Sequence, residues 1–188
     1  MDINTRIANR LSTLRKSRQL SLEALAEKCA VSRSMISLIE RGQSSPTAVV
    51  LEKLATGLGV PLAALFEAPA QEPGHLLRAG DQLQWRDPQS GYIRRNVSPS
   101  GAQSAVQVVE VHFPAGASVA YETSSRDARV DQQVWMLAGR MDIHVGEQAY
   151  ALEIGDCLAF QLDRPIRFHN PHDEPARYAV IIVTDAYR

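Results

Sequence analysis

The 188-residue chain has 45% hydrophobic and 22% charged residues, the composition of an ordinary folded globular protein. No apolar run reaches the length of a membrane span and the first ten residues are too polar for a signal peptide, so we expect a cytoplasmic protein. The net charge of −1 conceals an asymmetry, because residues 1–68 carry +3 and residues 69–188 carry −4. The amino-terminal third is therefore the part suited to a phosphate-rich partner.

The first predicted helix has an apolar stripe at intervals of three and four residues: Ile3, Ile7, Leu11 and Leu14. Its other faces carry basic side chains. Either these are simply solvated, or Arg10 or Arg18 reaches a nucleic-acid backbone.

Residues 21–42 contain two further short runs at helical spacing. Ser21 and Ser32 directly precede these runs and are suited to cap them, because a serine hydroxyl accepts a hydrogen bond from a first-turn N–H. Only Ala30 and Val31 separate the first helix from the second cap, so the two helices must turn sharply onto each other. This pattern predicts a helix-turn-helix, whose second helix can enter a DNA major groove.

The outward positions of the second helix are small or hydrogen-bonding, as a face pressed against bases should be. Arg33 is the leading candidate for reading a base, because a guanidinium can grip guanine through two hydrogen bonds. Further contacts to base edges or their surroundings are expected from Ser32, Ser34, Ser37 and Leu38. Contacts to phosphates are expected from Ser21, Arg41, Gln43 and Ser44.

Two more helices are predicted before residue 68. Thr47 is suited to cap the first of them, and Pro61 to open a short final one. Residues 4–66 resemble the DNA-binding domain of the Cro/phage-repressor-like (Xre) family, most closely in the segment VSRSMISLIERGQSSPT. The resemblance implies a five-helix bundle that binds double-stranded DNA.

Composition changes after this domain. We predict a helix-turn-helix domain over 1–68, a linker over 69–78 and a β domain over 79–188. Short β-type runs separated by Gly, Pro, Asp and Asn are typical of a closed sandwich or barrel. Strands are expected at residues 82–85, 92–97, 106–113, 134–138, 141–145, 149–152, 157–160 and 178–184, with a hairpin turn at 145–148.

The second half also resembles a known family. Residues 113–116, 134–140, 155–160 and 165–171 resemble the two sequence blocks of a cupin β-barrel, or jelly roll. The family's metal site does not carry over: Gln132 stands at its acidic ligand position, Ile166 stands where a histidine is expected, and His169 is displaced. We therefore expect neither a metal nor another cofactor, although His169 and His172 with Asp173 could be written as a weak metal pair.

A polar and aromatic set remains that suits an uncharged or zwitterionic small molecule at the barrel mouth: Tyr121, Gln132, Gln133, Trp135 and His169. The alternative is that Trp135 and Tyr121 are core or dimer contacts, and strand alternation allows only one of the two glutamines to face inward. Cys29 and Cys157 are expected to be reduced, buried small hydrophobic residues, with a redox-sensing thiol as the alternative.

These observations predict a two-domain α + β protein that is not an enzyme. We expect a sequence-specific DNA-binding transcriptional regulator acting as a repressor, whose cupin domain forms a homodimer and senses a small-molecule effector. The alternatives are a metal-dependent cupin enzyme tethered to DNA, and an antitoxin-like module that binds DNA and another protein.

Overall fold

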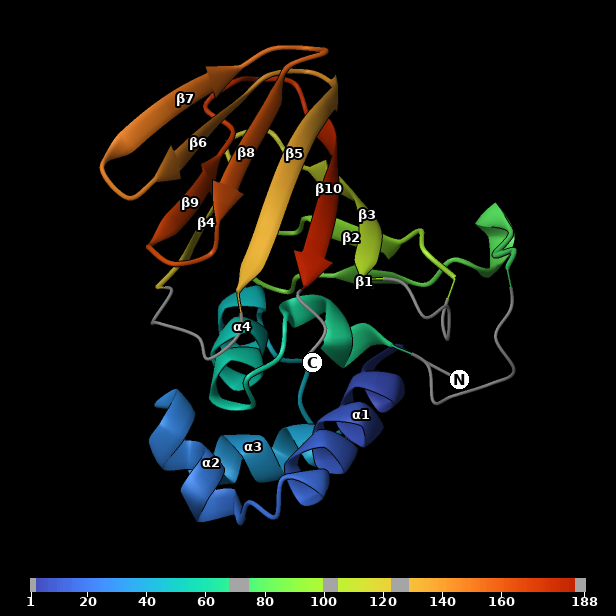
Figure 1. Ribbon diagram of the computed structural model, residues 1–188, viewed down its shortest axis with the longest axis vertical. Helices are drawn as coiled ribbons and strands as arrows, with labels where there is room; N and C mark the ends of the chain where they lie inside the picture. The colour runs from blue at the N-terminus through green and yellow to red at the C-terminus, as the bar shows by residue number, and fades with distance from the viewer. Residues whose placement is uncertain (1–2, 68–74, 100–104, 123–128, 185–188) are drawn as a thin grey trace.

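A computed structural model describes residues 3–67, 75–99, 105–122 and 129–184. It contains a helical head and a two-sheet β domain stacked along the long axis of the molecule (Figure 1). Residues 68–74, most of the expected linker, lie outside the described residues, and the domain boundaries at 68 and 79 stay predictions. Among the helices of the described segments, none has the length and apolar character needed to cross a bilayer.

The head contains four α-helices and one 3₁₀ helix in the described residues. Their bounds are α1 Ile3–Ser17, α2 Leu22–Cys29, α3 Arg33–Glu40, α4 Ala48–Gly57 and η1 Leu62–Phe66. The expected stripe of α1 is confirmed, because Ile7, Leu11 and Leu14 are buried and Ile3 packs against the same core. In Figure 1, α2 and α3 lie at the end of the molecule farthest from the β domain, and α4 lies between them and the strands.

The predicted count of five α-helices is wrong. The final element, η1, is a 3₁₀ helix, in which the Ala64 N–H donates to the carbonyl of Pro61 three residues earlier (2.9 Å). A run of five residues after Pro61 is too short to gain much from α-helical i→i−4 bonds, so the tighter turn forms instead.

In its described residues the β domain has ten antiparallel strands in two sheets, with a short 3₁₀ helix η2 (Ala79–Asp81) before the first. The six-stranded sheet has the order β1-β2-β3-β10-β5-β8 and the four-stranded sheet β4-β9-β6-β7. The strand bounds are β1 Gln84–Arg86, β2 Ile93–Asn96, β3 Val106–Phe113, β4 Ser118–Tyr121, β5 Val130–Ala138, β6 Met141–Val145, β7 Gln148–Leu152, β8 Cys157–Gln161, β9 Ile166–His169 and β10 Ala176–Thr184. Apolar side chains of both sheets meet in the middle, the arrangement of a jelly roll.

The predicted hairpin at 145–148 is confirmed, because Val145 pairs with Gln148 across a two-residue turn that begins with Gly146 at φ +60°. Two strands were not predicted, β4 and β9. Each has only four residues, too few for alternation to stand out, and Pro165 directly precedes β9.

The head and the β domain share a packed junction. The Phe66 ring of η1 contacts Trp85 of β1 edge-on, with ring centroids 5.5 Å apart. Asp87, in the turn after β1, is buried, and its Oδ1 accepts a hydrogen bond from the Ala48 N–H at the first turn of α4 (2.9 Å). Glu67 accepts from Arg10 of α1 (2.5 Å) and from Gln107 of β3 (2.7 Å). The β domain therefore holds the head through apolar and polar contacts together.

Candidate nucleic-acid interface and barrel cavity

The turn between α2 and α3 is fixed by its caps. The Ser21 hydroxyl accepts from the Ala24 N–H (3.0 Å), and the Ser32 hydroxyl accepts from the Met35 N–H (3.2 Å), so both predicted caps are confirmed. Ala30 adopts a left-handed conformation at φ +51°, which ends α2 and lets the chain reverse within three residues.

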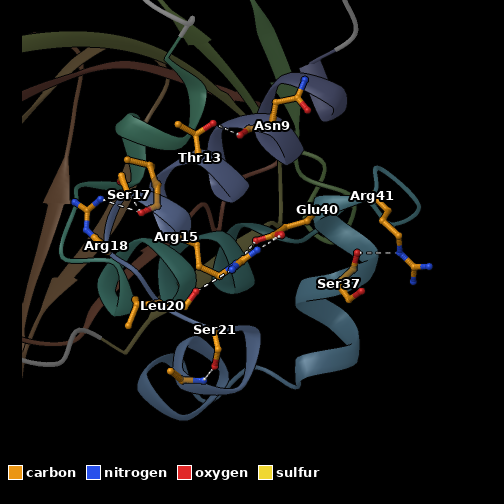
Figure 2. Close-up of polar contacts among 12 residues, drawn as sticks. Asn9, Thr13, Arg15, Ser17, Arg18, Leu20, Ser21, Ser37, Glu40 and Arg41 are labelled. Atoms are coloured by element: carbon orange, nitrogen blue, oxygen red, sulfur yellow. Dashed lines mark hydrogen bonds and ion pairs between the residues drawn. The ribbon is translucent and has the colours of Figure 1, made fainter.

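The far end of α3 is held by an ion pair that the sequence does not reveal. Arg15 of α1 donates from Nε and Nη2 to the two carboxylate oxygens of Glu40 (2.7 and 2.8 Å), and from Nη1 to the Leu20 carbonyl (2.8 Å) (Figure 2). The hydrogen bonds to Glu40 are the main reason why the pKa of Arg15 is raised. The side chains are only 12% and 11% exposed, so this pair fixes where α3 lies on the head.

One face of α3 is open. Ser32, Arg33 and Ser34 are exposed, whereas Ile36 and Ile39 are buried in the head. Ser37 and Leu38 are partly buried on the remaining side. The helix thus presents its amino-terminal turn outward and packs into the head through Ile36 and Ile39.

Arg33 has a partner in the free protein. Its Nε lies 2.5 Å from Oε1 of Glu23 in α2, and the two side chains are 65% and 59% exposed. Hydrogen bonding to its own backbone N–H is the largest cause lowering the pKa of Glu23, and Arg33 adds to it. An ion pair this exposed contributes little stabilising free energy, so the guanidinium of Arg33 is readily available to another acceptor.

The expected phosphate contacts are arranged around this turn. Arg41 is exposed and extends from the end of α3, with its Nε donating to the Ser37 carbonyl (3.2 Å) (Figure 2). Gln43 is exposed, whereas Ser44 is partly buried with its hydroxyl 3.8 Å from the Met35 sulfur. Arg10 is not free to reach DNA, because it donates to the Ala64 carbonyl and to Glu67.

A cavity of about 60 Å³ lies between the sheets of the β domain, on the side facing the head. Two of the predicted ligand residues, Tyr121 and Gln132, line it, together with Arg94, which the sequence did not single out. Glu52 of α4 and Leu62 of η1 line it from the head. The cavity is thus shared between the two halves of the molecule.

The prediction that five residues share this cavity is wrong for Gln133, Trp135 and His169. Strand alternation places Gln133 and Trp135 on the outer face of the six-stranded sheet, where Trp135 is 48% exposed. On β9 the alternate residues Ile166 and Phe168 face the cavity, so His169 faces the other way.

The two cysteines differ in burial. Cys29 is buried as predicted. Cys157 is exposed, contrary to the prediction, because it pairs with Trp135 on the outer face of the six-stranded sheet.

The donor set of a cupin metal site is missing from this cavity. Ile166 presents a hydrocarbon side chain to the cavity where the family's histidine is expected, and Gln132 offers a neutral amide. Within the described ranges, no three His, Cys, Asp or Glu residues are grouped as a metal would require.

The helix-turn-helix family HTH_3 matches residues 11–65 of the chain. The control protein C.MunI of a Mycoplasma species is 41% identical over 66 residues, which cover 35% of this chain and 89% of that protein. The chain belongs to the Xre family.

Similarity to helix-turn-helix regulators extends beyond the head. The HTH-type transcriptional regulator SutR of Escherichia coli (strain K12) is 27% identical over 94% of this chain and 93% of its own length. The crystal structure of an HTH_3 family transcriptional regulator from Vibrio cholerae superposes with a TM-score of 0.76 at 27% identity, covering 99% of this chain and 98% of that chain. This Xre-family chain therefore shares its two-part organisation, a helix-turn-helix head and a cupin domain, with a solved regulator.

An enzyme shares the fold of this Xre-family chain. The crystal structure of iron(II) HppE superposes with a TM-score of 0.50 at 13% identity, covering 96% of this chain and 99% of that chain. At that identity the likeness shows the fold alone, and the family match and the relatives above identify a regulator.

Proposed function

We propose that this protein is a sequence-specific transcriptional repressor that binds a palindromic operator as a homodimer. The helix-turn-helix family match and the regulator relatives support the DNA-binding transcriptional role. The observation that carries the proposal is the position of α3. It lies at the end of the molecule away from the β domain, with its amino-terminal turn exposed (Figure 1).

In this proposal the roles follow the exposure of the side chains. Arg33 leaves Glu23 and donates two hydrogen bonds to a guanine, while Ser34, Ser37 and Leu38 adjust the preference at neighbouring bases. The first turn of α3 approaches a phosphate beside Ser32, because helix N–H groups carry partial positive charge. Phosphate contacts come from Ser21, Arg41, Gln43 and Ser44.

The dimer contact is proposed on the outer face of the six-stranded sheet. Trp135 is one of the few large apolar side chains exposed in the described residues, and its cross-strand neighbours Ala179 and Cys157 are small. A second copy packing its own Trp135 against these small residues would bury the ring symmetrically. Two heads joined this way would present their α3 helices to major grooves about one helical turn, roughly 34 Å, apart.

Selection of bound sequences from random duplexes, followed by affinity measurements with the selected operator, tests the DNA-binding role. Arg33→Ala is expected to weaken operator binding by about 1–3 kcal/mol, or roughly five- to 150-fold, and to relax the preference at one base pair. Arg164→Ala is the matched control, because Arg164 is an exposed arginine of the β domain that pairs with its neighbour Asp163. Equal operator affinity in Arg33→Ala and wild type would remove Arg33 from the role of base reader.

Light scattering on the full chain tests the dimer. Trp135→Glu is expected to give monomers at micromolar concentration and to abolish tight binding to the two-half-site operator, because it places a charge in the proposed contact. Ile154→Glu changes another exposed apolar residue, outside this sheet face, and is expected to leave the dimer intact. A Trp135→Glu protein that is still dimeric contradicts this choice of face while leaving DNA binding untouched.

A further inference from the structure

Arg94 of β2 is a buried charge with two guanidinium nitrogens that have no hydrogen-bond partner among the described residues. The residue is 6% exposed, and the two nitrogens are Nε and Nη2. Its guanidinium lies over the Phe66 ring, 5.1 Å from the centroid, but a ring face does not satisfy the N–H groups. Burial lowers the pKa of Arg94, yet an arginine stays charged near neutral pH.

Such an arrangement is costly unless something else pairs with the charge. Buried guanidinium groups in proteins normally donate to carboxylates, carbonyls or ordered water. The cavity beside Arg94 is therefore the place where an acceptor fits.

The surroundings specify what kind of acceptor. Tyr92 and Tyr121 line the same cavity with their hydroxyl oxygens 3.2 Å apart, and Tyr178 lines it as well. Burial is the largest cause raising the pKa of all three tyrosines, so they remain protonated donors. The rest of the lining is mainly apolar, including Val119, Phe113 and Phe168, with Gln132 and Glu52 as its other polar members. The guanidinium and tyrosine donors beside this hydrocarbon surface suit a small anion with a short apolar tail.

We propose that the cavity binds a small organic carboxylate, whose two oxygens accept hydrogen bonds from the guanidinium fork of Arg94. A volume of about 60 Å³ is several times the roughly 10–15 Å³ that one water requires, which fits a ligand of a few carbon atoms. This inference rests on the proposed function and adds the chemical class of the effector and its site.

The head forms part of the same site, which gives the ligand a route to DNA binding. Leu62 of η1 and Glu52 of α4 line the cavity, and Phe66 of η1 lies under the Arg94 guanidinium. A carboxylate that draws the guanidinium away from Phe66 changes the contact between η1 and the β domain. The ligand shifts operator affinity to the extent that it binds one placement of the head more tightly than another.

Thermal unfolding of the full-length protein tests the site. The probes are acetate, propionate, butyrate and benzoate at up to 10 mM, with butyramide and sodium chloride as uncharged and ionic-strength controls. At least one carboxylate is expected to raise the Tm of the wild type by about 5 °C, while butyramide and chloride leave it unchanged.

Arg94→Met separates a binding role from a structural one. We expect the ligand-free variant to keep or exceed the wild-type Tm, because an unpaired buried charge is removed, and to lose the response to carboxylates. Tyr121→Phe keeps the charge and the ring and is expected to retain a weaker response. An equal response in Arg94→Met, a response to butyramide equal to that of butyrate, or no response to any of the four carboxylates overturns the proposal.

Operator binding distinguishes this inference from the proposed function. The carboxylate that raises the Tm is expected to change operator affinity at least threefold in the wild type and not in Arg94→Met. If the operator is bound and its affinity does not respond, the link to the head is overturned while the repressor proposal stands. If no duplex is selected at all, the proposed function fails, and the Tm series still decides whether the cavity binds carboxylates.

Discussion

Helices α3 and α4 have similar caps at their amino-terminal ends, but the two ends lie in different surroundings. Each starts with a hydroxyl cap, Ser32 accepting from the Met35 N–H and Thr47 from the Val50 N–H (3.3 Å). The first turn of α3 faces solvent. At α4 the Ala48 N–H donates to the buried carboxylate of Asp87, which also accepts from the Ser90 N–H (2.8 Å) and hydroxyl (2.5 Å).

The difference shows how one structural feature serves two purposes. A helix amino terminus attracts negative charge through its unpaired N–H groups and its dipole. At α4 the β domain supplies that charge itself, which fastens the head to the barrel. At α3 the same attraction remains available for a phosphate of the operator.

Removing the carboxylate at α4 should have the largest effect. Asp87→Ala leaves the Ala48 N–H and the Ser90 groups without their buried acceptor, and we expect the free energy of unfolding to fall by about 3 kcal/mol. Chemical denaturation of the full chain measures this. Asp87→Asn keeps one acceptor oxygen and is expected to lose less than half as much. A loss below about 0.5 kcal/mol in Asp87→Ala would mean that the junction does not depend on this cap.

Loosening the support of α3 should have the next largest effect. Arg15→Met strands the Glu40 carboxylate in a nearly buried position, and we expect a loss of about 2 kcal/mol in the free energy of unfolding together with weaker operator binding. Lys16→Met, at an exposed position of the same helix, is the control.

The double variant Arg15→Met with Glu40→Gln sharpens this test. It should lose less than the sum of the single changes, because no charge is left unpaired. Strict additivity would show that the two side chains do not act as a pair.

Removing the negative charge of Glu23 beside the exposed end of α3 should have the smallest effect. It should strengthen operator binding, whereas the preceding variants weaken the protein or its binding. Glu23→Gln frees Arg33 and removes a negative charge near the DNA phosphates, so operator affinity is expected to rise about two- to fivefold at low salt without a change in Tm. Glu27→Gln, at an exposed position of the same helix, should raise it less. Tighter binding by Glu27→Gln than by Glu23→Gln would show that net charge, and not the release of Arg33, is responsible.

The head was largely predictable because its determinants are local. Caps, stripe and turn lie within a few residues of one another, so Ser21, Ser32 and Thr47 could be assigned from the sequence alone. The Arg15–Glu40 pair joins residues 25 positions apart, and no local pattern connects them. The hydrogen bond from the Ala48 N–H to Asp87 joins residues 39 positions apart, in the head and in the β domain.

The fold class of the β domain could be predicted from the sequence, but the residues that line its cavity could be predicted only in part. Alternation allowed only one of two adjacent glutamines to face inward, and Gln132 is the one. Arg94 and Arg95 are adjacent in the sequence, but the pleat sends them to opposite faces, Arg95 to Glu110 outside and Arg94 into the cavity. Which face of β2 is buried depends on how this strand pairs with distant strands. The four residues of the strand alone do not determine that pairing.

The two tryptophans of the chain stand in opposite surroundings. Trp85 is 2% exposed and touches Phe66 across the junction, whereas Trp135 stands on the open sheet face. Their intrinsic fluorescence should therefore separate by emission wavelength and by access to an aqueous quencher such as iodide. Without any attached dye, the protein carries one optical reporter for the seating of its head and another for the proposed dimer face.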